Sequence, residues 1–290
     1  MTRGVTVTVN DGLWQEILDS CNHILGHNVI SIKRVRRLAG QANFVAGLIW
    51  TWRPFLSSLW KAIARKKSKT TAKRSYIWVK QIRDSLVWIK AFLTHRREAM
   101  AKVYYTILHS STMEVVTIVT DASPSGLGGL LIKNGVVQEG YFDMVTQGDQ
   151  KRLGKAALTS EGQQVWEALA ILVALRLWGK TWLSRHTVLK VKSDSMSALI
   201  AMARLKGRSP GVIAIMREMA LDIGAAAYLP TTDQHIPGLS NDLAYALSRQ
   251  FESPAKTLPA ELAAVKLVRP EPRDRSWWIA AMPKARKPRR

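Results

Sequence analysis

The sequence predicts an α/β domain, in which helices flank a mixed β-sheet, preceded by a mostly helical basic segment. The apolar period changes near residue 115, from the helical spacing of residues 12–110 to short strand-like runs. A hairpin signal then precedes alternating helices and strands, an order that argues for a mixed sheet with helices on its faces. The basic residues are concentrated before the change of period.

Residues 12–110 are expected to be mostly helical. "LWQEILDSCNHIL" has helical apolar spacing, and Ser31 is an N-cap candidate for a run that places Val35 and Leu38 on one face. "RPFLSSLWKAI" predicts a short helix with Pro54 in its first turn. After a basic loop, "KKSKTTAKRS", the stretch "YIWVKQIRDSLVWIKAFLT" predicts another helix.

The expected sheet begins with the strand "EVVTIVT" and a hairpin whose turn is Asn134-Gly135, a strong two-residue turn signal. "SEGQQVWEALAILVALRLWG" predicts a long helix ending at Gly179, and "TVLKVKSD" alternates as a strand. Two helices, a last strand in "AAAYLPTTDQHI" and a helix capped near Ser240 or Asn241 complete the pattern. We divide the chain into a helical basic segment (1–110), an α/β domain (111–250) and a Pro-rich basic tail (251–290).

Charge indicates the class of partner. The net charge is +22, and residues 31–110 carry 18 Lys/Arg against 2 Asp/Glu, whereas residues 111–250 carry 14 against 12. A strongly basic segment beside a near-neutral one predicts a polyanion-binding part joined to a part with another task. Nucleic acid is the expected partner, and a solvated basic face without a partner is the alternative.

Several classes of protein are excluded. The single cysteine, Cys21, rules out a disulfide framework and a multi-cysteine zinc site, and it suits an intracellular compartment. We find no signal peptide, and the longest uncharged run, Leu38–Trp52, is short for a membrane span, so no membrane partner is expected. The last residues, "PKARKPRR", are typical of a nuclear signal or of a plain basic tail.

Three carboxylates occur where an apolar pattern should exclude them. Asp121 and Asp194 each end a strand, and Glu167 lies in the almost wholly apolar run "VWEALAILVAL". Each alone has an ordinary explanation, a turn cap for the two aspartates and an exposed helix side for the glutamate. Neighbouring strands and a crossing helix would bring all three together, and such a set favours Mg²⁺ or Mn²⁺. Two such ions can activate water and stabilise the leaving oxygen in phosphodiester hydrolysis.

Four blocks in this order resemble the ribonuclease H domain of retroelement reverse transcriptases: "TDASPSGLGG", "SEGQQVWEALAILVALRLWG", "VKSDSMSAL" and "HIPGLSNDLAYALSR". The resemblance implies a five-stranded mixed sheet with flanking helices and a D-E-D-D set of metal ligands that cuts the RNA strand of RNA–DNA hybrids. Asp121, Glu167 and Asp194 match the first three ligand positions. The segments before residue 110 resemble the thumb or connection region, so the chain is similar to the C-terminal part of a reverse transcriptase, with a polymerase portion as a possible partner.

The fourth ligand position differs from the family's pattern. The last block usually reads H-x-P-G-x-x-N-x-x-A-D-x-L-S-R, and Tyr245 stands where its aspartate is expected. Asp242, three residues earlier, would share a helix face with Tyr245 and is a candidate fourth ligand, or an ordinary first-turn acid. His235 is expected at a strand end and receives no catalytic role.

The leading hypothesis is therefore a ribonuclease H-type endonuclease without a polymerase site, since no Asp-Asp pair occurs in the chain. The alternatives are a catalytically impaired nucleic-acid-binding remnant of the same fold, and an integrase- or transposase-like nuclease. Ser123, Ser125 and Asn241 are candidate contacts to nucleic acid, or turn and cap residues. The tryptophans are expected in the core rather than as stacking platforms, namely Trp50, Trp52, Trp60, Trp78 and Trp88.

Overall fold

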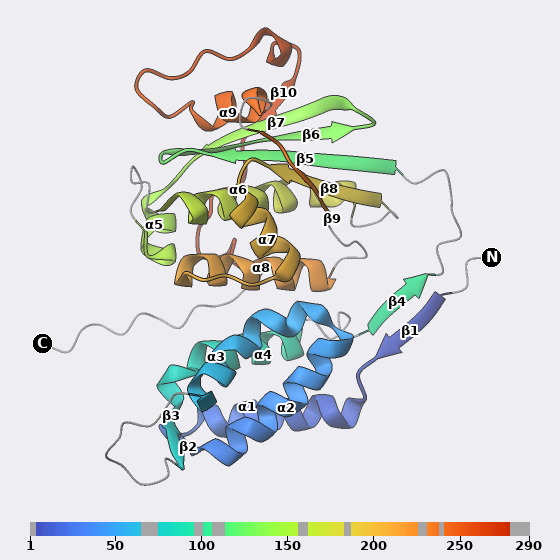
Figure 1. Ribbon diagram of the computed structural model, residues 1–290, viewed down its shortest axis with the longest axis vertical. Coiled ribbons are helices and arrows are strands. Elements are labelled where there is room, and N and C mark those ends of the chain that lie inside the picture. Colours follow the sequence, from blue (N-terminus) through green and yellow to red (C-terminus); the bar gives the residue numbers. More distant parts are fainter. Residues whose placement is uncertain are drawn as a thin grey trace, which may run out of the picture. The chain divides into compact units, whose positions relative to one another are not determined.

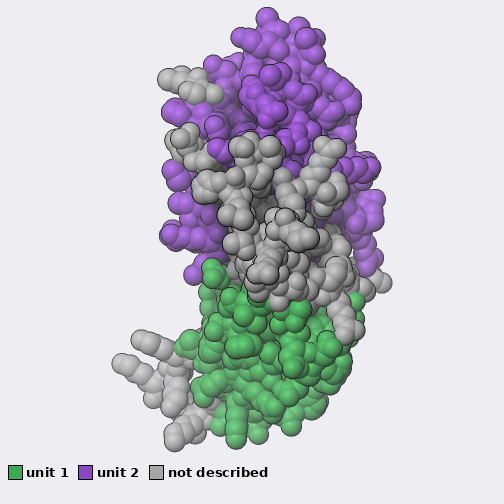
Figure 2. Space-filling model, turned by 90° about the vertical axis from the view of Figure 1, so that its right-hand side faces the viewer, with its two compact units in different colours: residues 1–108, 279–290 green, residues 109–278 purple. Residues whose placement is uncertain are grey.

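A computed structural model of the chain describes residues 4–64, 75–95, 101–105, 114–155, 162–182, 187–225, 231–237 and 241–278 (Figure 1). These residues form two compact units, and the division falls between residues 108 and 109 (Figure 2). Residues 109–278 make up the second unit.

The first unit is built from helices and two short antiparallel strand pairs. The helices are α1 (Asp11–Leu25), α2 (Ile32–Leu48), α3 (Arg53–Ala64) and α4 (Arg83–His95). Strand β1 (Gly4–Thr8) pairs with β4 (Ala101–Tyr105), and β2 (Val29–Ser31) pairs with β3 (Tyr76–Trp78). The Ser31 side chain accepts a bond from the Arg34 N–H, which confirms the predicted N-cap. Buried Trp52, Phe55, Trp88 and Phe92 contact one another in the core of this unit.

Residues 76–78 differ from the expected helix. They form β3, in which Ile77 is buried between exposed Tyr76 and Trp78. Pairing with β2 explains the difference, because Ile77 lies opposite buried Ile30 and the two isoleucines fill the core together. A short 3₁₀ turn at Val79–Gln81 then leads into α4, where the helical period begins.

The second unit contains the mixed sheet that the sequence predicts. Its strands are β5 (Glu114–Ala122), β6 (Gly126–Lys133), β7 (Val136–Met144), β8 (Thr187–Ser193), β9 (Thr231–His235) and β10 (Lys266–Val268), in the order β10-β7-β6-β5-β8-β9. Strands β5, β6 and β7 are antiparallel, and β8 and β9 continue parallel to β5. The turn between β6 and β7 has positive φ at Asn134 (50°) and Gly135 (82°), as the Asn-Gly signal requires.

Helices cover both faces of this sheet (Figure 1). They are α5 (Gln147–Leu153), α6 (Gln163–Leu177), α7 (Met196–Arg204), α8 (Pro210–Ala225) and α9 (Asp242–Ser248). Helix α6 is buried from Val165 to Leu175 because it lies between the sheet and α7 and α8. Helix α9 packs on β6 and β5 from the opposite face. The five principal strands and their helices confirm the ribonuclease H-like fold class.

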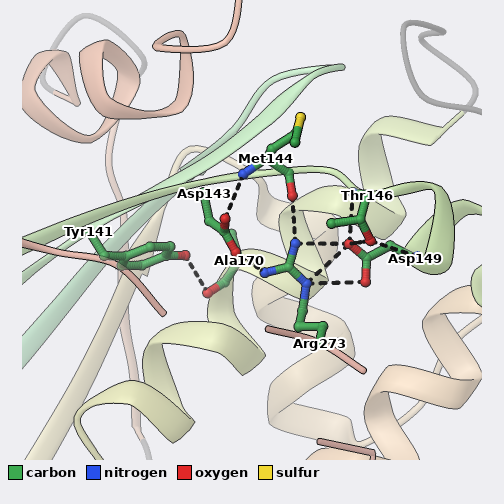
Figure 3. A network of polar contacts seen from close by, with 7 residues as sticks. All are labelled: Tyr141, Asp143, Met144, Thr146, Asp149, Ala170 and Arg273. Atoms are coloured by element: carbon green, nitrogen blue, oxygen red, sulfur yellow. Dashed lines mark hydrogen bonds and ion pairs between the residues drawn. The ribbon is translucent and has the colours of Figure 1, made fainter. Parts of the chain in front are cut away.

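Residues 251–278 differ from the expected Pro-rich tail because they fold onto the second unit. Strand β10 adds to the sheet beside β7. The buried Arg273 guanidinium donates to Asp149 at 2.8–3.1 Å, to the Met144 carbonyl at 2.6 Å and to Asp143 (Figure 3). A buried guanidinium requires such partners, which lie more than 120 positions away in the sequence. The basic end "PKARKPRR" lies outside the described residues.

The close approach of α9 to β6 requires glycine. A Cβ on Gly128 would lie 2.5 Å from the Ser248 nitrogen and 2.7 Å from the Ala244 oxygen, both of them backbone atoms of α9. Gly128→Ala is therefore expected to lower the free energy of unfolding by about 1–3 kcal/mol, because the helix must shift. The matched control is Gly40→Ala in α2, where nothing lies within 4 Å and the helix should gain about 1 kcal/mol. Urea unfolding of the two variants checks both signs, and equal effects would contradict the proposed contact.

Candidate metal centre

The register of two parallel strands places the first two carboxylates side by side. Thr120 in β5 lies opposite Ser193 in β8, so the next residues along both strands are Asp121 and Asp194. Strands that run in parallel end at the same edge of a sheet, and Asp194 therefore leaves β8 where Asp121 lies near the end of β5. The sequence predicts that Asp121 and Asp194 lie close together, and this strand pairing explains their proximity.

Helix α6 supplies the third carboxylate. One oxygen each from Asp121, Glu167 and Asp194 lies within 4.8 Å of the other two. Asp121 and Glu167 are buried, and Asp194 is partly exposed. Gln163, one turn before Glu167, donates at 2.8 Å to the Glu167 Oε1 and at 2.5 Å to the carbonyl oxygen of Ala122. This amide holds α6 to the end of β5 and orients the glutamate.

Burial and mutual repulsion disfavour the charged forms of these acids. Burial, with the charge of Asp194, raises the pKa of Asp121 from 3.8 to about 6, although a hydrogen bond from Ser248 opposes the shift. Burial also raises the pKa of Glu167 well above its ordinary value, and the charges of Asp121 and Asp194 add to the effect. A set of carboxylates that is this costly to ionise is stabilised by a bound cation.

Besides their charge, the hydrogen bonding of the three acids fits a divalent metal. Within the described part of the chain, Glu167 Oε2 and Asp194 Oδ1 are buried and have no hydrogen-bond partner. Buried acceptors without partners are unusual and costly. Both belong to the cluster, and an all-oxygen donor set of this kind suits hard cations such as Mg²⁺ or Mn²⁺. The three acids are thus arranged so that an ion would complete their coordination.

Ser248, which no sequence pattern marked as a site residue, contacts the cluster directly. Its hydroxyl donates to the Asp121 carboxylate and also lies 3.0 Å from the Tyr245 carbonyl oxygen. Helix α9, which carries Tyr245, thereby contacts Asp121 through Ser248. The signal for Ser248 lies in the sequence, because it is the serine of the L-S-R ending of the segment from His235 to Arg249.

Neither Tyr245 nor the candidate fourth ligand, Asp242, belongs to the three-acid group. Tyr245 is partly buried, with the Arg249 guanidinium 4.6 Å and the Lys256 ammonium 4.3 Å from its ring centre. Asp242 is exposed in the first turn of α9 and is not a member of the group that could hold an ion. Its role as a fourth ligand stays a prediction.

The three candidate nucleic-acid contacts lie near the centre in different environments. Ser123 is fully buried, donates at 2.9 Å to the Ser248 carbonyl oxygen and accepts from the Gly126 N–H at 2.8 Å. Ser125 is partly exposed. Asn241 is buried and donates to the Thr120 carbonyl oxygen at 3.2 Å, instead of capping α9 with its side chain. As contacts to nucleic acid all three stay predictions, and Ser125 is the most accessible of them.

No family model and no curated protein matches the sequence. Among solved structures, ribonuclease H1 from the halophilic archaeon Halobacterium salinarum NRC-1 is 15% identical, with 49% of this chain and 99% of that chain covered and a TM-score of 0.37. The N-terminal RNase H domain of a Mycobacterium tuberculosis protein, fused to maltose binding protein, is 17% identical over 49% and 96%, with a TM-score of 0.37. The foamy viral protease-reverse transcriptase in complex with RNA/DNA hybrid is 15% identical, with 78% of this chain and 28% of that chain covered and a TM-score of 0.28. These values are too low to transfer an activity, so the functional argument rests on the sheet and the carboxylates.

Proposed function

We propose that the second unit is a divalent-metal-dependent endonuclease that hydrolyses the RNA strand of RNA–DNA hybrids. The observation that carries the proposal is the convergence of three carboxylates, two of which keep buried oxygens without partners, at one edge of a ribonuclease H-like sheet. Asp121, Glu167 and Asp194 would hold the metal, for which the family resemblance implies two ions. Bound there, such ions would supply activation of water and stabilisation of the leaving oxygen of a phosphodiester.

The protein's own residues would contribute to the reaction in three ways: they orient the acids, bury them and bind the nucleic acid. Gln163 fixes the orientation of Glu167, and Ser248 fixes that of Asp121. The buried setting of the acids strengthens their attraction for a cation. A basic first segment would bind phosphates, and a hybrid of A-like shape is recognised by its form and its 2′-hydroxyls rather than by base edges.

One observation favours a second candidate, a catalytically impaired nucleic-acid-binding remnant of the same fold. Tyr245 replaces the fourth carboxylate, and two cations flank its ring. A missing ligand would weaken the binding of metal beside it. The integrase- or transposase-like alternative shares the fold, but the block from His235 to Arg249 and the thumb-like leader argue against it.

The origin and location of the chain are also proposals. We infer a retroelement reverse transcriptase as the source, with a polymerase portion as a partner, from the order of the motifs. An intracellular location is inferred from the single cysteine, and a nuclear one from "PKARKPRR", for which a plain basic tail is the alternative. Of the helices described, none combines the length and apolar character that a bilayer crossing demands.

The direct test uses an RNA–DNA hybrid with a label on the RNA strand. The full chain should cleave the RNA in Mg²⁺ or Mn²⁺ and should not cleave it in excess EDTA. Matched duplexes of DNA–DNA and RNA–RNA with the same sequence should remain intact. Glu167→Gln should abolish the cleavage and leave binding of the hybrid within about threefold, since this residue lies in the centre and not in the basic segment.

Three outcomes would decide against the proposal. Cleavage that survives Glu167→Gln would indicate a contaminating nuclease. Binding of the hybrid without cleavage, unchanged by the substitution, would favour the remnant. Equal cleavage of all three duplexes would show a nuclease of a different specificity.

A further inference from the structure

The outward face of the β2–β3 strand pair in the first unit carries an exposed aromatic pair. Ile30 and Ile77 face the core as register partners. On the opposite face, Tyr76 is 60% exposed and Trp78 is 58% exposed. Val29, which lies opposite Trp78, is 39% exposed and extends the apolar surface.

The exposure of Trp78 differs from the sequence expectation, which placed the tryptophans in the core. Trp52 and Trp88 are buried as expected, whereas Trp78 is not, and Trp60 on α3 is 39% exposed. The side chain of Trp50 lies outside the described residues. Large apolar side chains that remain together in water forgo the stabilisation of burial, and such patches mark binding sites.

The charge of the sequence that adjoins the two strands indicates the class of ligand. Residues 28–38 and 75–83, which contain the two strands and their continuations, hold no Asp or Glu and six basic residues: Lys33, Arg34, Arg36, Arg37, Lys80 and Arg83. All six are exposed. Arg37 lies 3.4 Å from Glu16, an exposed pair that is weak in water, and Asp84 follows at the start of α4. Arg34 also contacts His23, and Arg83 donates to the Leu25 carbonyl oxygen at 3.5 Å. The aromatic pair therefore belongs to strands whose adjoining sequence is basic and exposed, a charge that complements a polyanion.

We propose that Tyr76 and Trp78 stack on the bases of a single-stranded nucleic acid while the surrounding Lys and Arg side chains bind its phosphates. Side chains two positions apart on one face of a β-strand are about 6.6–6.8 Å apart. This spacing is about twice the 3.4 Å between successive nucleotides along one strand of duplex DNA, so the two rings match a stacked strand in steps of two nucleotides. Aromatic rings in a basic groove are the usual means of binding single strands without sequence preference. The site is distinct from the metal centre in its residues and takes a ligand with unpaired bases, not the hybrid itself.

The test separates stacking from charge. Fluorescence anisotropy in EDTA measures the affinity of the full chain for a labelled oligonucleotide of about 12 nucleotides, and for an abasic strand of the same length that keeps every phosphate. The intact protein should bind the base-containing strand at least tenfold more tightly, since each stacked base contributes roughly tenfold. The double variant Tyr76→Ala/Trp78→Ala should lose this preference and keep its affinity for the abasic strand.

Two further variants keep the result interpretable. Phe44→Ala removes an aromatic ring that is 61% exposed on α2 and should leave the preference intact. Trp78→Tyr, which keeps a ring, should retain most of the preference, and circular dichroism verifies that each variant is folded. Removing charge with Lys33→Ala/Lys80→Ala should weaken both strands alike and reduce the salt dependence of binding.

The proposal is overturned if the intact protein binds both strands equally, or if Phe44→Ala has the same effect as the double variant. A change in oligomeric state on substitution of Tyr76 and Trp78, measured by light scattering, would assign the face to a second copy of the chain instead. The binding assay contains EDTA and therefore does not depend on the metal centre. A negative binding result would not contradict the proposed nuclease activity, and a negative cleavage result would not contradict this binding site.

Discussion

Asp121→Asn is expected to abolish cleavage of the hybrid and, at the same time, to stabilise the metal-free protein. Asp121 is buried within 4.8 Å of two other carboxylates, so removing its charge relieves repulsion and desolvation. We expect a gain of about 1–3 kcal/mol in the free energy of unfolding near pH 7.5. Loss of one ligand should lower the cleavage rate by roughly 100-fold or more.

The gain should depend on pH in a defined direction. The pKa of Asp121 is raised from 3.8 to about 6, so the folded protein holds this proton more tightly than the unfolded chain. The resulting stability is fully present below about pH 4 and is lost as the pH rises through about 6, a difference of about 3 kcal/mol. Asp121→Asn cannot titrate, so its advantage over the metal-free wild type should grow from pH 5 to pH 8.

Thermal unfolding with and without Mg²⁺ measures both parts of this prediction. Metal should raise the Tm of the wild type and leave that of Asp121→Asn nearly unchanged. The matched control is Asp149→Asn, because Asp149 is also buried but is ion-paired with Arg273 at 2.8 Å (Figure 3). Breaking such a pair should destabilise the protein by about 3–5 kcal/mol. Shifts of the same sign in both variants would show that Asp121 is a structural acid.

Tyr245→Asp is expected to tighten metal binding and to raise the cleavage rate by roughly tenfold or more. Ser248 bonds to Asp121, and Tyr245 lies three positions earlier in α9, on the same side of the helix. A carboxylate there matches the family's fourth position and adds an oxygen ligand. It would also replace a ring that Arg249 and Lys256 flank with an anion that they could pair with.

Two substitutions at the same position identify the cause of the gain. Asparagine has nearly the same size as aspartate but carries no charge, so Tyr245→Asn should not raise the affinity for metal. Tyr245→Phe keeps the ring that Arg249 and Lys256 contact and should resemble the wild type. Titration calorimetry with Mg²⁺ or Mn²⁺ reports binding independently of cleavage. If the Asn and Asp variants behave alike, the position does not face the metal, and loss of cleavage in Asp242→Asn would then favour Asp242 as the fourth ligand.

The elements and the convergence of the three acids could be predicted from the sequence because both depend on local patterns. Period-two and helical spacing identified the strands and helices, and a carboxylate at the end of each of two strands is brought to one edge by parallel pairing. The sequence singled out Glu167 because the helix around it is almost wholly apolar and therefore has no polar side on which an acid would be exposed. The exceptions include the short strands β2, β3, β4 and β10, which the sequence pattern did not predict. In β3, for example, three residues are too few to establish a period against the longer helical pattern that follows them.

Only the tertiary structure decided the contacts between distant segments. Ser248 reaches Asp121 because glycines in β6 let α9 approach closely, and Arg273 folds residues 251–278 onto the sheet because Asp143 and Asp149 meet it there. Trp78 is exposed because Ile77, its neighbour in β3, fills the core. Each of these contacts depends on which surfaces meet after folding. The pattern of apolar and polar residues along the sequence does not specify which distant segments will pack together.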